Sequence, residues 1–139
     1  MNTYVLIAGI VASLAFLGHL VIGVRSFLGP IIYSGTREIP KRVMHSLFHY
    51  MTVYQLLTAV ILLLFATGKK IVYLDVVNEG VVQFIGVSYA MFALAQWYVI
   101  RQTSVKKASR KLFQWIFWFV IAVCCIVGTV DINIPALVK

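Results

Sequence analysis

Acidic residues are scarce in this chain. Only 4 of its 139 residues are Asp or Glu, against 12 Lys and Arg, and no acidic residue lies within its long apolar segments. Carboxylate-rich di-iron centres and carboxylate-driven cation antiporters need acidic side chains inside the helix bundle. The sequence therefore argues against both classes.

Other signatures of chemistry are missing as well. The sequence has no Gly-rich nucleotide loop and no Cys-x-x-Cys motif. Its two cysteines, Cys124 and Cys125, are adjacent in an apolar run. Neighbouring residues on a helix point about 100° apart, so we expect reduced thiols packed in a core. No Asp joins His45 and Ser46, which argues against a serine hydrolase.

Charge of either sign is low. Hydrophobic residues make up 62% of the chain and charged residues 12%, whereas a soluble domain carries about 25% charged residues. The charges collect in short clusters between apolar runs, so lipid is the expected solvent. The formal net charge of +8 is typical of basic cytoplasmic loops in membrane proteins. We therefore expect one compact domain whose partner is the lipid bilayer and not nucleic acid.

Four apolar segments approach or exceed the roughly 20 residues that cross a bilayer. They predict an all-α fold, an integral membrane four-helix bundle that forms a single transmembrane domain over residues 1–139. No basic region precedes the first segment, so we expect it to stay in the mature protein and not to be cleaved as a signal peptide. The predicted transmembrane helices are residues 4–24, 43–67, 80–100 and 112–130.

The basic residues predict the orientation. Loop 25–42 holds four Lys and Arg and loop 101–111 holds five, which is nine of the twelve. Because basic loops stay in the cytoplasm, both loops are expected there and both termini outside, in a bacterial inner membrane or an equivalent one. Gly29, Pro30 and Pro40 are breakers that predict a non-helical loop over 25–42.

The three histidines of the chain fall at one predicted depth. With a rise of about 1.5 Å per residue, His45 and His49 lie about 6 and 12 Å inward of Lys41. By the same rise His19 lies about 9 Å inward of Arg25. His45 and His49 are four residues apart, the spacing by which one helix face offers two ligands to a metal ion.

His19 is expected to face a neighbouring helix. It continues a line of small residues, Ala8, Ala12, Ala15 and then Gly23, and small residues at this spacing let membrane helices approach closely. The first two predicted helices follow one another in the chain and are the expected neighbours. The sequence therefore predicts that the three imidazoles meet.

Two bound species fit three imidazoles. One is a transition-metal ion (Zn, Cu or Fe) held by His19, His45 and His49. The other is haem b, with His19 opposite His45 or His49 as axial ligands. Ligating histidines usually donate a hydrogen bond from the second ring nitrogen. Side chains expected at this depth to serve as partners are Gln96, Gln114 and Tyr50.

The function expected from these patterns is that of a small membrane protein that binds a metal ion or b-type haem near the cytoplasmic face. It would act in redox or metal handling, as a subunit of a larger complex with other membrane subunits or as a homo-oligomer. The alternative is a non-enzymatic structural, signalling or pore-forming subunit whose histidines serve packing or pH sensing.

Overall fold

The computed structural model describes residues 1–68 and 78–130. Within these ranges the chain is helical and has no strand, which confirms the all-α prediction. The segment between the second and third predicted transmembrane helices and the C-terminal tail, predicted to face outward, lie outside the described residues. The elements are α1 (Thr3–Gly18), the π-helix η1 (His19–Leu28), α2 (Gly29–Ile32), α3 (Glu38–Thr67), α4 (Glu79–Gln102), α5 (Ala108–Lys111) and α6 (Gln114–Val130).

Three of the described helices are long and apolar enough to cross a membrane. They are Thr3–Ile32 (α1, η1 and α2 in one run), Glu38–Thr67 and Glu79–Gln102, and α6 is a shorter apolar helix of 17 residues. A run of 30 residues measures about 45 Å along its axis. Since the hydrocarbon core is about 30 Å thick, the first two runs are long enough to reach well past it.

The connection between the first two long helices is shorter than the sequence predicts. Residues 25–32 remain helical and α3 begins at Glu38, so only residues 33–37 link the two. The prediction of a non-helical loop over 25–42 was therefore wrong. Pro30 lies in the first turn of α2 and Pro40 in the first turn of α3. A proline there removes an N–H that would have no intrahelical partner, so it begins a helix without breaking one.

The π-helix η1 joins α1 to α2 without a break. The N–H of Gly29 donates to the carbonyl oxygen of Val24, five residues earlier, as the wider π turn requires. Short π segments are rare and frequently occur at functional sites. His19 is the first residue of this one.

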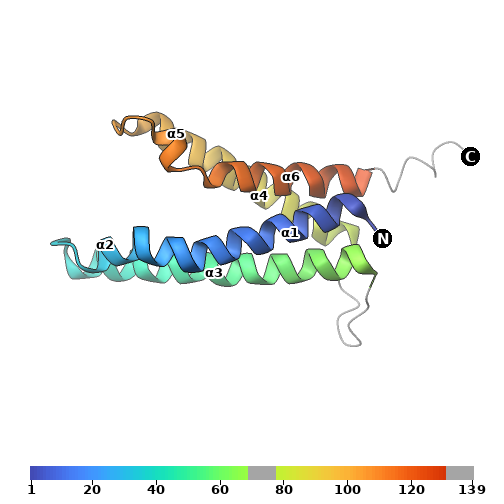
Figure 1. Ribbon diagram of the computed structural model, residues 1–139, viewed down its shortest axis with the longest axis horizontal. Coiled ribbons are helices and arrows are strands. Elements are labelled where there is room, and N and C mark those ends of the chain that lie inside the picture. Colours follow the sequence, from blue (N-terminus) through green and yellow to red (C-terminus); the bar gives the residue numbers. More distant parts are fainter. Residues whose placement is uncertain (69–77, 131–139) are drawn as a thin grey trace, which may run out of the picture.

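The helices form two antiparallel hairpins, seen in Figure 1. The N-terminal hairpin (residues 3–67) packs α1 against α3, and the C-terminal hairpin (residues 79–130) packs α4 against α6; α1 also packs on α6. Asn2 hydrogen-bonds to both hairpins at the end that holds the N-terminus. Its Nδ2 donates to the carbonyl oxygen of Gly128 at 2.7 Å, and its backbone N–H donates to that of Ala66 at 3.1 Å.

Small residues set the close approach of the helices. Ala8 and Ala12 on α1 are fully buried, as their line in the sequence predicts. A Cβ atom added to Gly9 would lie 2.8 Å from Cδ2 of Leu63 on α3. On α4, a Cβ atom added to Gly86 would lie 2.9 Å from Cβ of Cys125 on α6. These positions bring the backbones together and replace bulky side-chain packing.

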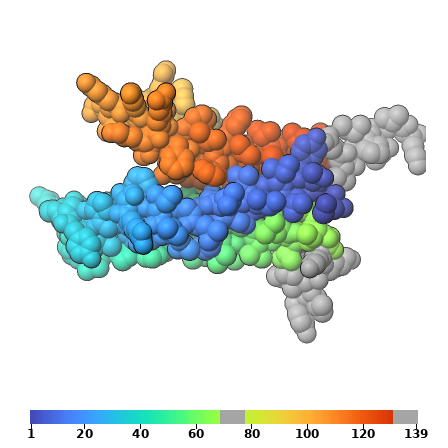
Figure 2. Space-filling model, viewed as in Figure 1, coloured from blue at the N-terminus to red at the C-terminus, as the bar shows by residue number. Residues whose placement is uncertain are grey.

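The two hairpins separate toward the end that carries α2 and α5. Figure 2 shows them in contact near the N-terminus and divided by a hollow toward the opposite end. Direct packing of α3 on α4 is limited. It includes the buried pair Thr58 and Tyr89, whose hydroxyl oxygens lie 2.8 Å apart. The histidines lie on the N-terminal hairpin, nearer its open end than this buried pair.

Candidate functional site

The structure brings His45 and His49 side by side on α3. Their ring centroids are 4.8 Å apart and the ring planes are tilted by 44°. His45 is half-buried and His49 is exposed, so one helix face presents two imidazoles with access from outside the bundle. This is the local arrangement that the four-residue spacing predicts.

His19 is held by Phe48. Its Nε2 lies 3.1 Å from the carbonyl oxygen of Phe48, and the two rings stack with centroids 3.9 Å apart and planes 18° from parallel. A carbonyl oxygen only accepts hydrogen bonds, so Nε2 carries the hydrogen and donates it. In the neutral ring Nδ1 then holds the lone pair.

Phe48 is the residue that organises this contact, and sequence reasoning missed it. Its carbonyl oxygen also accepts a hydrogen bond from the Thr52 hydroxyl at 3.0 Å. Gly23 leaves room for its ring, because a Cβ atom there would lie 3.1 Å from Cζ of Phe48. The signal in the sequence was Gly23 itself, four residues after His19 on the same helix face.

The three imidazoles lie at a similar height along the helices. His45 and His49 form a pair, whereas His19 stands apart from them. His19 lies level with Phe48, the neighbour of His49, and the Phe48 ring lies edge-on to that of His49 at 6.0 Å. Across residues 1–68 and 78–130, no group of three or more His, Cys, Asp or Glu side chains could hold a metal ion. The structure therefore brings two imidazoles together beside a histidine that is already bonded to the backbone.

The predicted hydrogen-bond partners of the histidines lie elsewhere. Gln96 lines a cavity between the hairpins. Gln114 begins α6, and its Oε1 is buried without a hydrogen-bond partner among the described residues. Tyr50 is 67% exposed. In the described part of the chain none of these three hydrogen-bonds to a histidine.

The surroundings of the pair are basic. Glu38 accepts a hydrogen bond from Nε of Arg42 at 2.6 Å and lies 3.9 Å from Nζ of Lys41. Among the described residues, the carboxylate at this end of α3 is therefore already paired. Neutral imidazoles without a carboxylate suit zinc, copper or iron and not magnesium or calcium, which prefer oxygen ligands.

Comparisons of the chain with protein families, with curated proteins and with solved structures find no match. Function is therefore inferred from the side chains and their geometry alone.

Proposed function

We propose that the protein is embedded in a membrane with α2 and α5 on the cytoplasmic side. Large apolar side chains cover the outside of the helices, as with Leu14, Val21 and Leu94, which are 55, 58 and 60% exposed. Soluble monomers rarely expose continuous apolar surface of this extent. The basic residues gather at the α2 and α5 end, which supports the orientation.

In that setting the protein binds a transition-metal ion through His45 and His49. The observation that carries the proposal is the adjacency of the two rings, 4.8 Å between centroids on one face of α3. Small side-chain rotations bring one nitrogen of each ring onto a shared ion, as in helical His-x-x-x-His metal sites. Water, a small ligand or a partner subunit completes the coordination.

A metal ion fits this geometry better than haem b. Two axial ligands of one haem approach the iron from opposite faces of the porphyrin. His45 and His49 project from the same face of one helix. His19 has one ring face covered by Phe48 and its Nε2 bonded to the backbone. Ligation through Nε2 would break its bond to the backbone, and Nδ1, the nitrogen left for an axial bond, lies beside Gly23 of the same helix, where an added Cβ atom would be 3.6 Å away.

Open coordination favours metal handling over a permanent structural ion. Structural zinc sites close four protein ligands around the ion, whereas exchange or catalysis needs a free position. Two imidazoles on one face of α3 leave the other coordination positions of the ion open to exchangeable ligands. The protein would then acquire, pass on or use a metal at the membrane surface, as a subunit of a larger complex.

The contacts of His19 favour the alternative function, in which a histidine serves helix packing. Its stacking on Phe48 and its bond to the Phe48 carbonyl oxygen hold η1 against α3. Polar contacts of this kind stabilise membrane helix packing. His19 is therefore not a ligand of the ion. It supports metal binding by His45 and His49 because it fixes the turn of α3 that carries Phe48.

The test is elemental analysis and absorption spectroscopy of the purified protein after incubation with zinc, copper or iron, or with haem. Wild type should retain about one metal ion per chain and show no Soret band. His45→Ala/His49→Ala should lose the ion, His19→Ala should hold it more weakly, and the neighbouring control Ser46→Ala should retain it. If the double variant keeps the metal ion, His45 and His49 are not the binding site. A stoichiometric Soret band would show that the bound species is haem and not a metal ion.

A further inference from the structure

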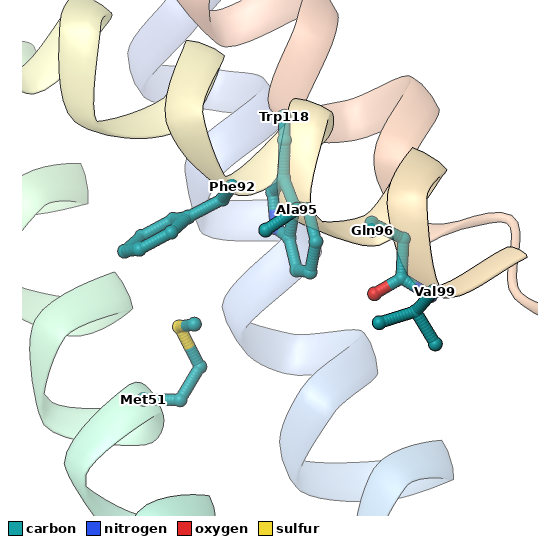
Figure 3. A pocket seen from close by; sticks show the side chains of 6 residues that line it. All are labelled: Met51, Phe92, Ala95, Gln96, Val99 and Trp118. Atoms are coloured by element: carbon teal, nitrogen blue, oxygen red, sulfur yellow. The ribbon is translucent and has the colours of Figure 1, made fainter. Parts of the chain in front are cut away.

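A second feature lies between the hairpins, away from the histidine pair. Where α3 and α4 separate there is a cavity of about 210 Å³. Figure 3 shows Met51 of α3 across from α4, with the ring of Trp118 from α6 beside Phe92. The residues that line the cavity are Met51, Phe92, Ala95, Gln96, Val99 and Trp118.

The lining selects an apolar occupant. Five of the six side chains are apolar, and Gln96 is the one amide among them. The cavity is open to the outside of the bundle, so a chain can enter it from the side. A segment of hydrocarbon chain therefore fits.

The rim next to this cavity is strongly basic. Val99 precedes Arg101 by two residues, about 3 Å along the helix axis and about 200° around it, so Arg101 lies beyond the cavity on a different face of α4. The guanidinium carbon of Arg101 lies 5.0 Å from the centroid of the Trp97 ring, which holds the charge at the helix end. Exposed lysine and arginine residues near this end of the hairpin are Arg101, Lys106, Lys107, Arg110 and Lys111.

These cations are not compensated by the chain around them. Residues 80–130 contain no Asp or Glu. Across 1–68 and 78–130 the recorded ion pairs are those of Glu38 with Lys41 and Arg42. Among the described residues, no carboxylate pairs with the five cations of the C-terminal hairpin. Such clusters next to a transmembrane helix attract anionic lipids.

We propose that the cavity and its basic rim form a binding site for one anionic phospholipid. An acyl chain enters between α3 and α4 while the phosphate lies beyond the end of the cavity, at the level of the cations of residues 101–111. A second copy of the chain is a poorer occupant, because it would bring the same five cations to the same rim. The proposal depends on the membrane embedding described above and not on metal binding.

The test is native mass spectrometry of the full-length protein in detergent, titrated with phosphatidylglycerol or phosphatidylcholine. Wild type should bind phosphatidylglycerol at least about tenfold more tightly. Val99→Trp fills the cavity and should weaken phosphatidylglycerol binding about tenfold or more. Val87→Trp is the matched control, since Val87 is 54% exposed on the same helix against 52% for Val99, and should bind as wild type does.

Charge removal tests the rim separately. Arg101→Gln/Lys106→Gln/Lys107→Gln should abolish the preference for phosphatidylglycerol and leave phosphatidylcholine binding unchanged, whereas Arg25→Gln/Arg37→Gln should keep the preference. Equal binding of the two lipids by wild type overturns the proposal, as does equal binding by Val99→Trp and Val87→Trp. Loss of a dimer in Val99→Trp alone, with lipid binding intact, would assign the cavity to a second copy and overturn it too.

Discussion

The hydroxyl oxygens of Thr58 and Tyr89 lie 2.8 Å apart in the buried interior where α3 meets α4. The Thr58 hydroxyl also lies 2.9 Å from the carbonyl oxygen of Tyr54 in its own helix. A carbonyl oxygen accepts, so Thr58 donates there and accepts the hydrogen of the Tyr89 hydroxyl. This bond links the two hairpins near the point at which they begin to separate.

Tyr89→Phe removes that interhelical donor and keeps the ring. We expect a loss of about 0.6 kcal/mol in unfolding free energy, the average measured for hydrogen bonds between membrane helices, and at most about 1.7 kcal/mol. The measurement is unfolding in detergent micelles by added dodecyl sulfate. Tyr98→Phe is the control, because Tyr98 is 60% exposed and should change little. Equal stability of Tyr89→Phe and wild type would show that the bond contributes nothing.

Gly86→Ala should separate α4 from α6. Its Cβ atom would lie 2.9 Å from Cβ of Cys125 and 3.4 Å from the carbonyl oxygen of Ala122, so the helices must move apart. We expect a destabilisation of about 1–3 kcal/mol. Gly18→Ala has nothing within 4 Å of the added atom and should be neutral or stabilising. If the two variants unfold alike, the close contact of α4 and α6 does not exist.

His19 and Phe48 should be energetically coupled. Their stacked rings, 3.9 Å apart, predict a coupling of about 0.5–1.5 kcal/mol in a double-mutant cycle. The variants are His19→Ala, Phe48→Ala and the double replacement, each unfolded under identical conditions. Strict additivity would contradict the packing role given to His19.

The orientation is open to labelling from either side of the membrane. In a background without Cys124 and Cys125, Ser104→Cys should react with an impermeant maleimide only when the cytoplasmic side is exposed. Asn78→Cys, at the opposite end of α4, should react only from outside. The reverse pattern would invert the topology and refute the basic-loop argument.

Hydrophobic length and the small-residue line predicted much of the fold from the sequence. The uncharged segments became helices, and Ala8 and Ala12 form the packing face of α1. Both signals extend over many residues, so a single exception does not change the prediction. The spacing of His45 and His49 likewise predicted their adjacency, because it depends only on helix geometry.

The effect of the helix breakers and the tertiary contacts of His19 were harder to predict from the sequence. Gly29 and Pro30 indicated the end of a helix, yet a proline in a first turn is compatible with continuation. The π-helix that starts at His19 has no local sequence signature. Whether His19 would meet His49 or Phe48 depends on how η1 lies against α3, which residue spacing within either helix does not encode.

The most direct test of the metal proposal is electron paramagnetic resonance of Cu²⁺ added at one equivalent per chain. Wild type should show superhyperfine splitting from two imidazole nitrogens, because His45 and His49 share one face of α3. His45→Ala and His49→Ala should each show one nitrogen, and the double variant only the spectrum of free copper. An unchanged two-nitrogen spectrum in the double variant would contradict binding at this pair.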